Sequence, residues 1–408
     1  MTSQTRQSAW PLLFAASAIL LITMGIRQSL GLFIAPINQA TGLGIVAISF
    51  AMAVGQFVWG AIQPVFGAIA DRHGPGGVLI VGAVLLAAGC ALTTLATHSW
   101  LLILSVGVLS AAGAGAGSFS ILIGATAHQI APERRSFASG FINAGGSLGQ
   151  FVFAPLNQLL ISASGWVIAL YAMAAAALAT IPIGRFVTAP ATRPAGAPVP
   201  AGAGLSLRGQ LAIASRDRSY WCLHAGFFTC GFHIAFLVTH LPGEVGLCDL
   251  PASVAASSLS IIGLANVGGS LAAGWLGNRM RMKWILFWMY LSRAVAIAVY
   301  LMAPKTALTF YLFAFVLGAT WLATVPPTAG LVAKLFGVRY LATLFGLTLL
   351  SHQIGGFFGA WLGGIALYRF GDYGWMWYAD MALALGAAVI NLPIRELPVA
   401  ASTLAART

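Results

Sequence analysis

The chain has 408 residues, of which 59% are hydrophobic and only 7% charged, and its mean hydropathy is +0.91. These values exclude a soluble globular protein, so lipid must surround most of the side chains. The net charge of +12 does not indicate a nucleic-acid partner, because the basic residues gather on one side of the predicted membrane spans.

Twelve apolar stretches follow one another along the chain. Each is long enough to cross a bilayer, since a hydrocarbon core of roughly 30 Å takes about 20 helical residues. The runs are continuous, without the alternation of a barrel strand, which favours helices. The predicted spans are 10–35, 45–70, 77–96, 100–128, 137–162, 165–187, 219–243, 252–277, 283–302, 306–333, 341–366 and 374–395.

The charged residues indicate the topology. With the N-terminus in the cytoplasm, 16 of the 20 Lys and Arg residues lie on the cytoplasmic side. Lys305 and Arg369 lie outside, and Arg27 and Arg293 lie within spans. This positive-inside bias predicts a multi-pass protein of the cell inner membrane with both termini cytoplasmic. The excess basic charge is then expected to contact anionic lipid, with no nucleic-acid partner.

The chain divides into two similar halves. Residues 188–218, rich in Pro, Ala and Gly and then basic, are expected to be a cytoplasmic linker between bundles 1–187 and 219–408. When the two halves are aligned, Arg27 meets His233 and Gly149 meets Gly355 at one shared offset. Parallel repeats of six spans predict a transporter whose site lies between the two bundles, near the middle of the membrane.

Two loop segments carry a specific resemblance. The segment G-A-I-A-D-R-H-G (67–74) is similar to the loop signature of the major facilitator superfamily, and Glu133-Arg134-Arg135 resembles the matching loop two spans later. The runs R-R-S-F-A-S-G-F-I-N-A-G-G (134–146) and S-I-I-G-L-A-N-V-G-G-S-L-A-A-G (260–274) look closest to the monocarboxylate porter and oxalate–formate antiporter branch. The resemblance implies twelve helices in two pseudo-symmetric bundles, with spans one, seven and eleven near a central cavity.

Span eight departs from the pattern of that branch. Asn266 and Ser270 stand where the animal carriers have an Asp and an Arg. The charge pair of the family is therefore missing, and its proton-coupling scheme does not transfer directly. Proton symport through a histidine and exchange against a second anion both remain open.

Arg27 is the leading candidate for a substrate-binding residue. Only uncharged residues, 11–25, separate it from the polar N-terminus, too few to complete a span, so the helix must continue past it. An intramembrane Arg is costly unless it faces a cavity or a partner. A guanidinium binds a carboxylate through two parallel hydrogen bonds, so Arg27 is predicted to clamp an organic anion. The competing interpretation is an Arg bonded to helix carbonyls.

Further residues are predicted to line the substrate-binding cavity together with Arg27. His233 aligns with Arg27 in the repeat, and His352 with Gln353 lies mid-way along span eleven. A neutral imidazole can donate to a carboxylate or take up a proton, although a lone His on an apolar helix is often only a packing residue. Arg293, Asn266 and Trp321 are added to the predicted substrate-binding set, Arg293 with two open roles: bracing helices or reaching the cavity.

Span ten and the cytoplasmic loops carry two more predictions. Pro326-Pro327 is expected to break span ten beside the cavity. Asp71 is expected to accept hydrogen bonds from a neighbouring helix terminus, or from Arg134 or Arg135, when the inner gate is closed. The predicted gating residues are Asp71, Arg72, Arg134 and Arg135.

The remaining residue types exclude other functions. Seven of the eight acidic residues fall in loops or at span ends, and only Asp380 enters a span, near its outer end, so no buried carboxylate is expected. This weighs against cation–proton exchange, as does Phe153-Ala154 where drug antiporters have Gly-Pro. The four cysteines show no metal or disulfide pattern. We expect no cofactor, no metal, no enzymatic activity and a monomer.

The sequence therefore predicts a secondary carrier of a mono- or dicarboxylate. Two alternatives stay open. One is an exporter of drugs or amphipathic metabolites, and the other is a carrier-like receptor that transports nothing.

Overall fold

The N-terminal half of the protein consists of helices and short helical turns. The computed structural model describes residues 9–188 and 205–399. Its first elements are α1 (Trp10–Ser29), the 3₁₀ turn η1 (Leu30–Phe33), α2 (Ile34–Thr41), α3 (Ile45–His73), α4 (Pro75–Thr93), α5 (Ser99–Leu102), the π-helical η2 (Ile103–Ser110), α6 (Ala111–Ala116), α7 (Phe119–Ala127), η3 (Pro132–Arg134), α8 (Arg135–Ser164) and α9 (Trp166–Thr188).

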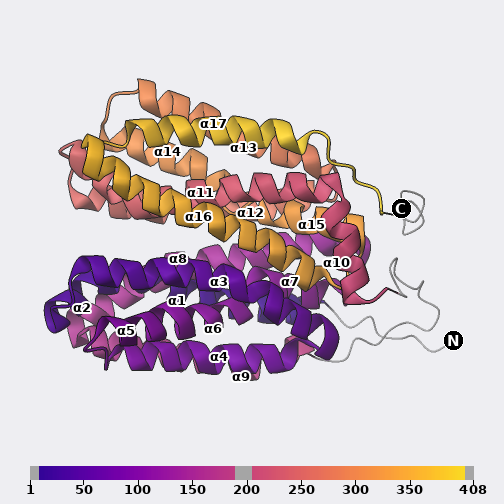
Figure 1. Cartoon of the computed structure of the whole chain (residues 1–408), viewed down its shortest axis with the longest axis horizontal. Coiled ribbons are helices and arrows are strands. Elements are labelled where there is room, and N and C mark those ends of the chain that lie inside the picture. Colours follow the sequence, from indigo (N-terminus) through magenta and orange to yellow (C-terminus); the bar gives the residue numbers. More distant parts are fainter. Residues whose placement is uncertain (1–8, 189–204, 400–408) are drawn as a thin grey trace.

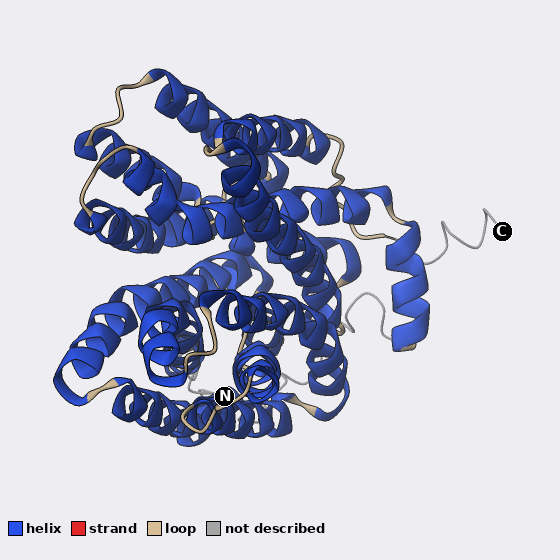
Figure 2. Cartoon of the chain, turned by 60° about the vertical axis from the view of Figure 1, so that its left-hand side comes forward, coloured by secondary structure: helices blue, strands red, loops and turns tan. Residues whose placement is uncertain are grey.

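The C-terminal half repeats this arrangement. Its elements are α10 (Leu207–Arg216), α11 (Arg218–Leu247), α12 (Ala252–Leu276), α13 (Met282–Met302), α14 (Ala307–Thr320), α15 (Val325–Phe336), α16 (Leu341–Phe370) and α17 (Gly374–Asn391). Ten helical stretches of the described chain are long and apolar enough to cross a membrane, and α8 and α17 complete twelve. The predicted all-helical, twelve-span fold is confirmed, and Figure 2 shows only helices and loops in the described chain.

The two halves lie side by side along their long axes (Figure 1). Their main contacts run between α3 and α16 and between α8 and α12. Within each half the same pairs pack: α1 with α8, and α11 with α16, which is the repeat of α8. Gly149 of α8 faces the Leu21 carbonyl, and its repeat partner Gly355 faces the Phe228 carbonyl, so neither position has room for a Cβ. Small residues therefore set the helix spacing.

Spans four and ten are broken helices. Span ten ends as α14 at Thr320 and resumes as α15 at Val325, so the break predicted from Pro326-Pro327 is present. Span four also breaks, between Ala116 and Phe119, where the sequence predicted a continuous helix. Both breaks leave backbone groups without helical partners, and side chains must bond them.

Part of the predicted linker is also helical. Helix α10 begins after Ser206, whose hydroxyl accepts a hydrogen bond from the Gly209 backbone N–H. Leu207 and Ala214 face inward, so the helix presents an apolar side to the protein. The Asp217 side chain then accepts from the Tyr220 N–H and starts α11. We call the end of the molecule that carries α10 the α10 side.

Candidate functional site

Arg27 lies in the second half of α1 and is partly exposed, although it sits within an apolar span. Its Nη2 donates a hydrogen bond to Gln56 Oε1, and its guanidinium stacks on the Trp59 ring, 4.3 Å from the centroid. Both partners belong to α3 and neither is an acid. Among the residues that the structure describes, no ion pair includes Arg27. The Arg27 charge is therefore held by a neutral amide and a ring.

Helix α16 brings polar side chains from the other bundle close to α3. Gln353 packs against Gly60, where a Cβ would come within 2.5 Å of the Gln353 Cβ. The Gln353 amide nitrogen lies 2.8 Å from Nδ1 of His352. This amide is therefore assigned as the donor to Nδ1, which leaves the imidazole proton on Nε2. Of the predicted site residues, the structure thus places Arg27 on α1, in contact with α3, and the His352–Gln353 pair on α16, which packs against α3 from the other bundle.

Several hydrogen-bond donors in this region have no partner. Among the described residues, Trp59 Nε1, His352 Nε2 and Gln28 Nε2 are buried and unbonded. Leaving a buried polar group unpaired costs about 1–3 kcal/mol, so such groups in a native protein call for an explanation. Trp59 lies under the Arg27 guanidinium, and His352 is close enough to interact with it electrostatically, so an anion bound there could accept from these donors and offset the charge of Arg27.

Arg293 lies elsewhere, at the break in span ten. It is 1% exposed, and its Nη2 donates to the backbone oxygens of Thr320 and Trp321, the latter at 2.6 Å. Its Nη1 lies 3.4 Å from the Cys230 sulfur. Of the two roles left open for Arg293, bracing helices is the one that these contacts fit, because its donors are used on carbonyls that the break frees.

Two asparagines bond the backbone N–H and carbonyl of Leu322, in the same break of span ten. Asn266 Oδ1 accepts from the Leu322 N–H, and Asn266 Nδ2 donates to Ser147 of α8. Asn143, also on α8, donates to the Leu322 carbonyl at 2.8 Å and to Ser270 at 2.7 Å. The broken segment of the C-terminal half is therefore bonded directly to the N-terminal half. Asn143 was missed as a candidate, although it is a polar residue inside an apolar span.

His233 lies inside the C-terminal bundle, 1% exposed, with its ring against that of Trp321 at 5.8 Å. Its Nδ1 is 2.5 Å from Oδ2 of Asp380, which is fully buried. The expectation that no buried carboxylate would be present is thus wrong for Asp380. The sequence showed that α17 carries this acid, but it could not show which side of the helix turns inward.

The α10 side is closed by direct contact between the bundles. Asp71 Oδ2, at the end of α3, accepts from the Thr343 backbone N–H at 2.8 Å and from its hydroxyl at 2.6 Å. Thr343 is in the first turn of α16, so a helix terminus is the partner that the structure gives Asp71. Gly67 and Gly124 lie against Ala342, where a Cβ on either would come within 2.7 Å. We call these five residues the inner lock.

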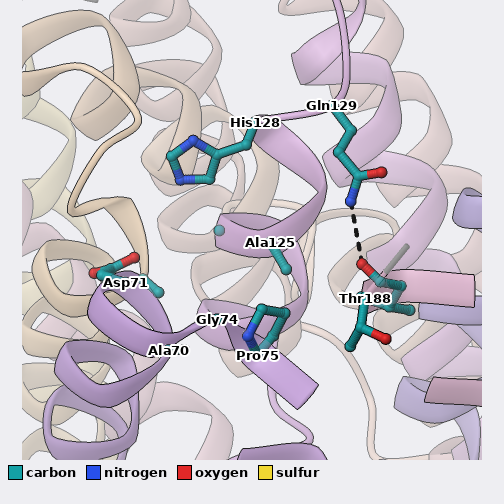
Figure 3. Close-up of a pocket in the computed structure, with 11 residues that line it drawn as sticks. Ala70, Asp71, Gly74, Pro75, Ala125, His128, Gln129 and Thr188 are labelled. Atoms are coloured by element: carbon teal, nitrogen blue, oxygen red, sulfur yellow. Dashed lines mark hydrogen bonds between the residues drawn. The ribbon is translucent and has the colours of Figure 1, made fainter. Parts of the chain in front are cut away.

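The basic residues predicted for gating make other contacts. Arg135 donates to the Ala127 and Ile130 carbonyls of its own bundle, and Arg72 and Arg134 are exposed. A cavity of about 320 Å³ lies beside the inner lock and is lined by Asp71, His128 and Gln129 among others (Figure 3). Gln129 Nε2 closes its far wall by donating to the Val187 carbonyl at 3.1 Å. No group of three or more His, Cys, Asp or Glu that could hold a metal occurs among residues 9–188 and 205–399.

Comparison with known proteins agrees with this architecture. Residues 13–360 match the family model of the Major Facilitator Superfamily. The chain belongs to this superfamily. Its fold is similar to that of the proton:xylose symporter XylE, with a TM-score of 0.73 at 13% identity over 95% of this chain and 96% of that one. A bacterial homologue of the iron transporter ferroportin gives 0.72 at 14% identity, over 93% of this chain and 98% of that one.

Curated relatives share low identity over most of their length. Monocarboxylate transporter 13 of Bos taurus is 28% identical over 374 residues, 89% of this chain and 84% of that protein. Monocarboxylate transporter 11 of Homo sapiens is 25% identical, over 95% of this chain and 83% of that protein. The oxalate:formate antiporter of Oxalobacter formigenes is 23% identical, over 89% and 86%. The predicted membership of the superfamily and similarity to this branch are confirmed.

Proposed function

We propose that this transporter carries a small organic anion, a mono- or dicarboxylate, across the cell inner membrane by alternating access. The observation that carries the proposal is Arg27, a partly exposed guanidinium within a span that contacts an amide and an aromatic ring. A cation within a membrane span that lacks an acidic partner is unfavourable alone, and the binding of an anion stabilises it.

The neighbouring donors define the expected ligand. The guanidinium keeps donors beyond the one used on Gln56, so it can hold both oxygens of a carboxylate. Trp59 Nε1 and His352 Nε2 are unbonded donors in the same region, on helices from different bundles. A carboxylate bonded to Arg27 and His352 would therefore connect the two halves. The relatives, which include monocarboxylate transporters and an oxalate:formate antiporter, support this ligand class.

Alternating access follows from the same two halves. The inner lock closes the α10 side in this conformation, so its release is the motion that would open that side. The positive-inside bias assigns the α10 side and both termini to the cytoplasm. Because residues of both bundles of one chain build the site, a single chain suffices, and we infer a monomer.

Counterflow in proteoliposomes tests the proposal. Protein reconstituted with internal lactate, pyruvate, formate or oxalate should take up the same labelled acid, and Arg27→Gln should abolish this uptake. Arg279→Gln is a matched control, since Arg279 also stacks on a tryptophan, Trp275, at 4.0 Å, at the end of α12. It should keep wild-type counterflow.

The two alternatives give different results in this assay. Uptake of amines that persists in Arg27→Gln would favour the exporter. Folded protein that exchanges none of the acids and none of the amines would favour the receptor. Either result would overturn the anion carrier.

A further inference from the structure

A second polar group lies in the interior of the C-terminal bundle. His233 and Asp380 come from different helices, α11 and α17, and both are at most 1% exposed. Their facing atoms are 2.5 Å apart, yet His233 Nε2 and Asp380 Oδ1 have no partner among the described residues. Such a pair can share one proton and accept another, and it is costly to bury for packing alone.

The surroundings of the pair limit its charge. Arg293 of α13 interacts electrostatically with Asp380, and the neutral Trp321 ring covers His233. The other titratable groups that interact with Arg293 are Tyr290 on α13, Cys230 on α11 and His352 on α16. Arg293 is a fixed cation. One carboxylate, one guanidinium and a neutral imidazole sum to zero charge. The cluster is therefore neutral before it takes up a proton and carries one positive charge afterwards, and in both states the Asp380 carboxylate has the Arg293 cation nearby.

The pair is also connected to the part of the protein that joins the bundles. His233 packs on Trp321, and the Trp321 carbonyl is held by Arg293 at 2.6 Å. The next residue, Leu322, is bonded by Asn143 of the N-terminal half and by Asn266 of α12. A change of charge at the pair therefore acts on Arg293 and, through it, on the broken segment that bridges the two halves.

We propose that His233 and Asp380 form the proton-binding site of this carrier, in place of the charge pair that is absent at Asn266 and Ser270. The pair already shares one proton between His233 Nδ1 and Asp380 Oδ2. A second proton enters from water on one side, is taken up at the unbonded His233 Nε2 or Asp380 Oδ1, and leaves as water reaches the pair from the other side. One proton and one carboxylate on Arg27 then move together without net charge. This inference rests on the proposed anion transport and adds the coupling ion to it.

Proteoliposomes with an acidic exterior and alkaline interior test the inference, with lactate, pyruvate, formate and oxalate as probes. Wild-type protein should accumulate at least one acid against its gradient and alkalinise the medium as it does so. In Asp380→Asn the rate of pH-driven uptake should fall at least about tenfold, whereas the rate of counterflow should fall less than about threefold. The ratio of pH-driven uptake to counterflow should therefore decrease. Asp249→Asn is the matched control, an acid-to-amide change in a loop at a positive φ of 54° that Asn also tolerates. It should keep the wild-type ratio.

The outcomes separate this inference from the proposed function. Counterflow by the wild-type protein without any response to the pH gradient, or an Asp380→Asn variant with the wild-type ratio, would refute the proton site alone. Absence of both counterflow and net uptake for every acid would refute anion transport and the proton site together. If Asp380→Asn does not fold, His233→Gln takes its place, and the same change in the ratio of pH-driven uptake to counterflow is expected; the wild-type ratio in His233→Gln would refute the proton site.

Discussion

The inner lock gives the most quantitative prediction. In Asp71→Ala the two hydrogen bonds from Thr343 are lost, and the first turn of α16 loses a carboxylate near its N-terminus. Hydrogen bonds to a charged group contribute about 1.5–3 kcal/mol, and a carboxylate at a helix N-terminus about 0.3–1 kcal/mol. Water replaces part of these interactions when the α10 side opens. We therefore expect Asp71→Ala to destabilise the closed state relative to the open state by about 2–3 kcal/mol. The ratio of closed to open molecules should fall by about 30- to 150-fold.

Pulsed electron paramagnetic resonance can measure the ratio of closed to open molecules. Spin labels at His73 and Arg281, both exposed on the α10 side, report the distance between the bundles, with Cys222 and Cys248 changed to Ser. Asp71→Ala should add a longer distance that the parent lacks. Thr343→Val keeps the backbone N–H bond and should show a smaller shift, since only the hydroxyl bond is lost.

A matched control separates the lock from helix capping in general. Asp217 also accepts from the first turn of a helix, but its partners Tyr220 and Arg395 lie in its own bundle. Asp217→Asn should leave the distance distribution unchanged. An unchanged distribution in Asp71→Ala, or a shift of equal size in Asp217→Asn, would refute the lock.

The remaining predictions concern stability and topology. Arg293→Gln should destabilise the protein by about 3–5 kcal/mol, because the carbonyls of Thr320 and Trp321 lose their donor and Asp380 loses a nearby cation. Thermal unfolding in detergent measures this loss, and an unchanged unfolding midpoint would contradict the bracing role. Gly67→Leu should clash with the Ala342 backbone and lengthen the His73–Arg281 distance, whereas Gly77→Leu, in open space, should not. A cysteine that replaces Lys305 should react with an impermeant thiol reagent added outside intact cells, whereas a cysteine that replaces Arg281 should not. The reverse pattern would show that the predicted orientation in the membrane is wrong.

The sequence predicted the fold well because its signals are local. Each continuous apolar run is a span by itself, and the Pro326-Pro327 pair marks the break of span ten. The break of span four was missed because glycines alone do not end a helix, although Ser118 there aligns with Thr324 in the repeat. Helix α10 was missed because the Pro and Gly residues before it dominate the composition of the linker.

The candidate site was predicted less completely, because it depends on which helix faces turn toward each other. A charge as isolated as Arg27 can be found from the sequence, and so can a polar pair such as His352 and Gln353. The pairing of His233 with Asp380 joins residues far apart in the chain, and no sequence pattern reports it. Asn143 could have been found, since a polar amide in a span needs a partner within the membrane.

The most direct test of the anion clamp is equilibrium binding of an acid and its neutral amide to protein in nanodiscs. Lactate and lactamide differ chiefly in charge at the group that Arg27 is proposed to hold. We predict that wild-type protein and Arg279→Gln bind lactate, or the acid that counterflow identifies, at least about tenfold more tightly than the amide, and that Arg27→Gln loses this preference. Equal binding of acid and amide by the wild-type protein, or a preference that survives in Arg27→Gln, would contradict the account.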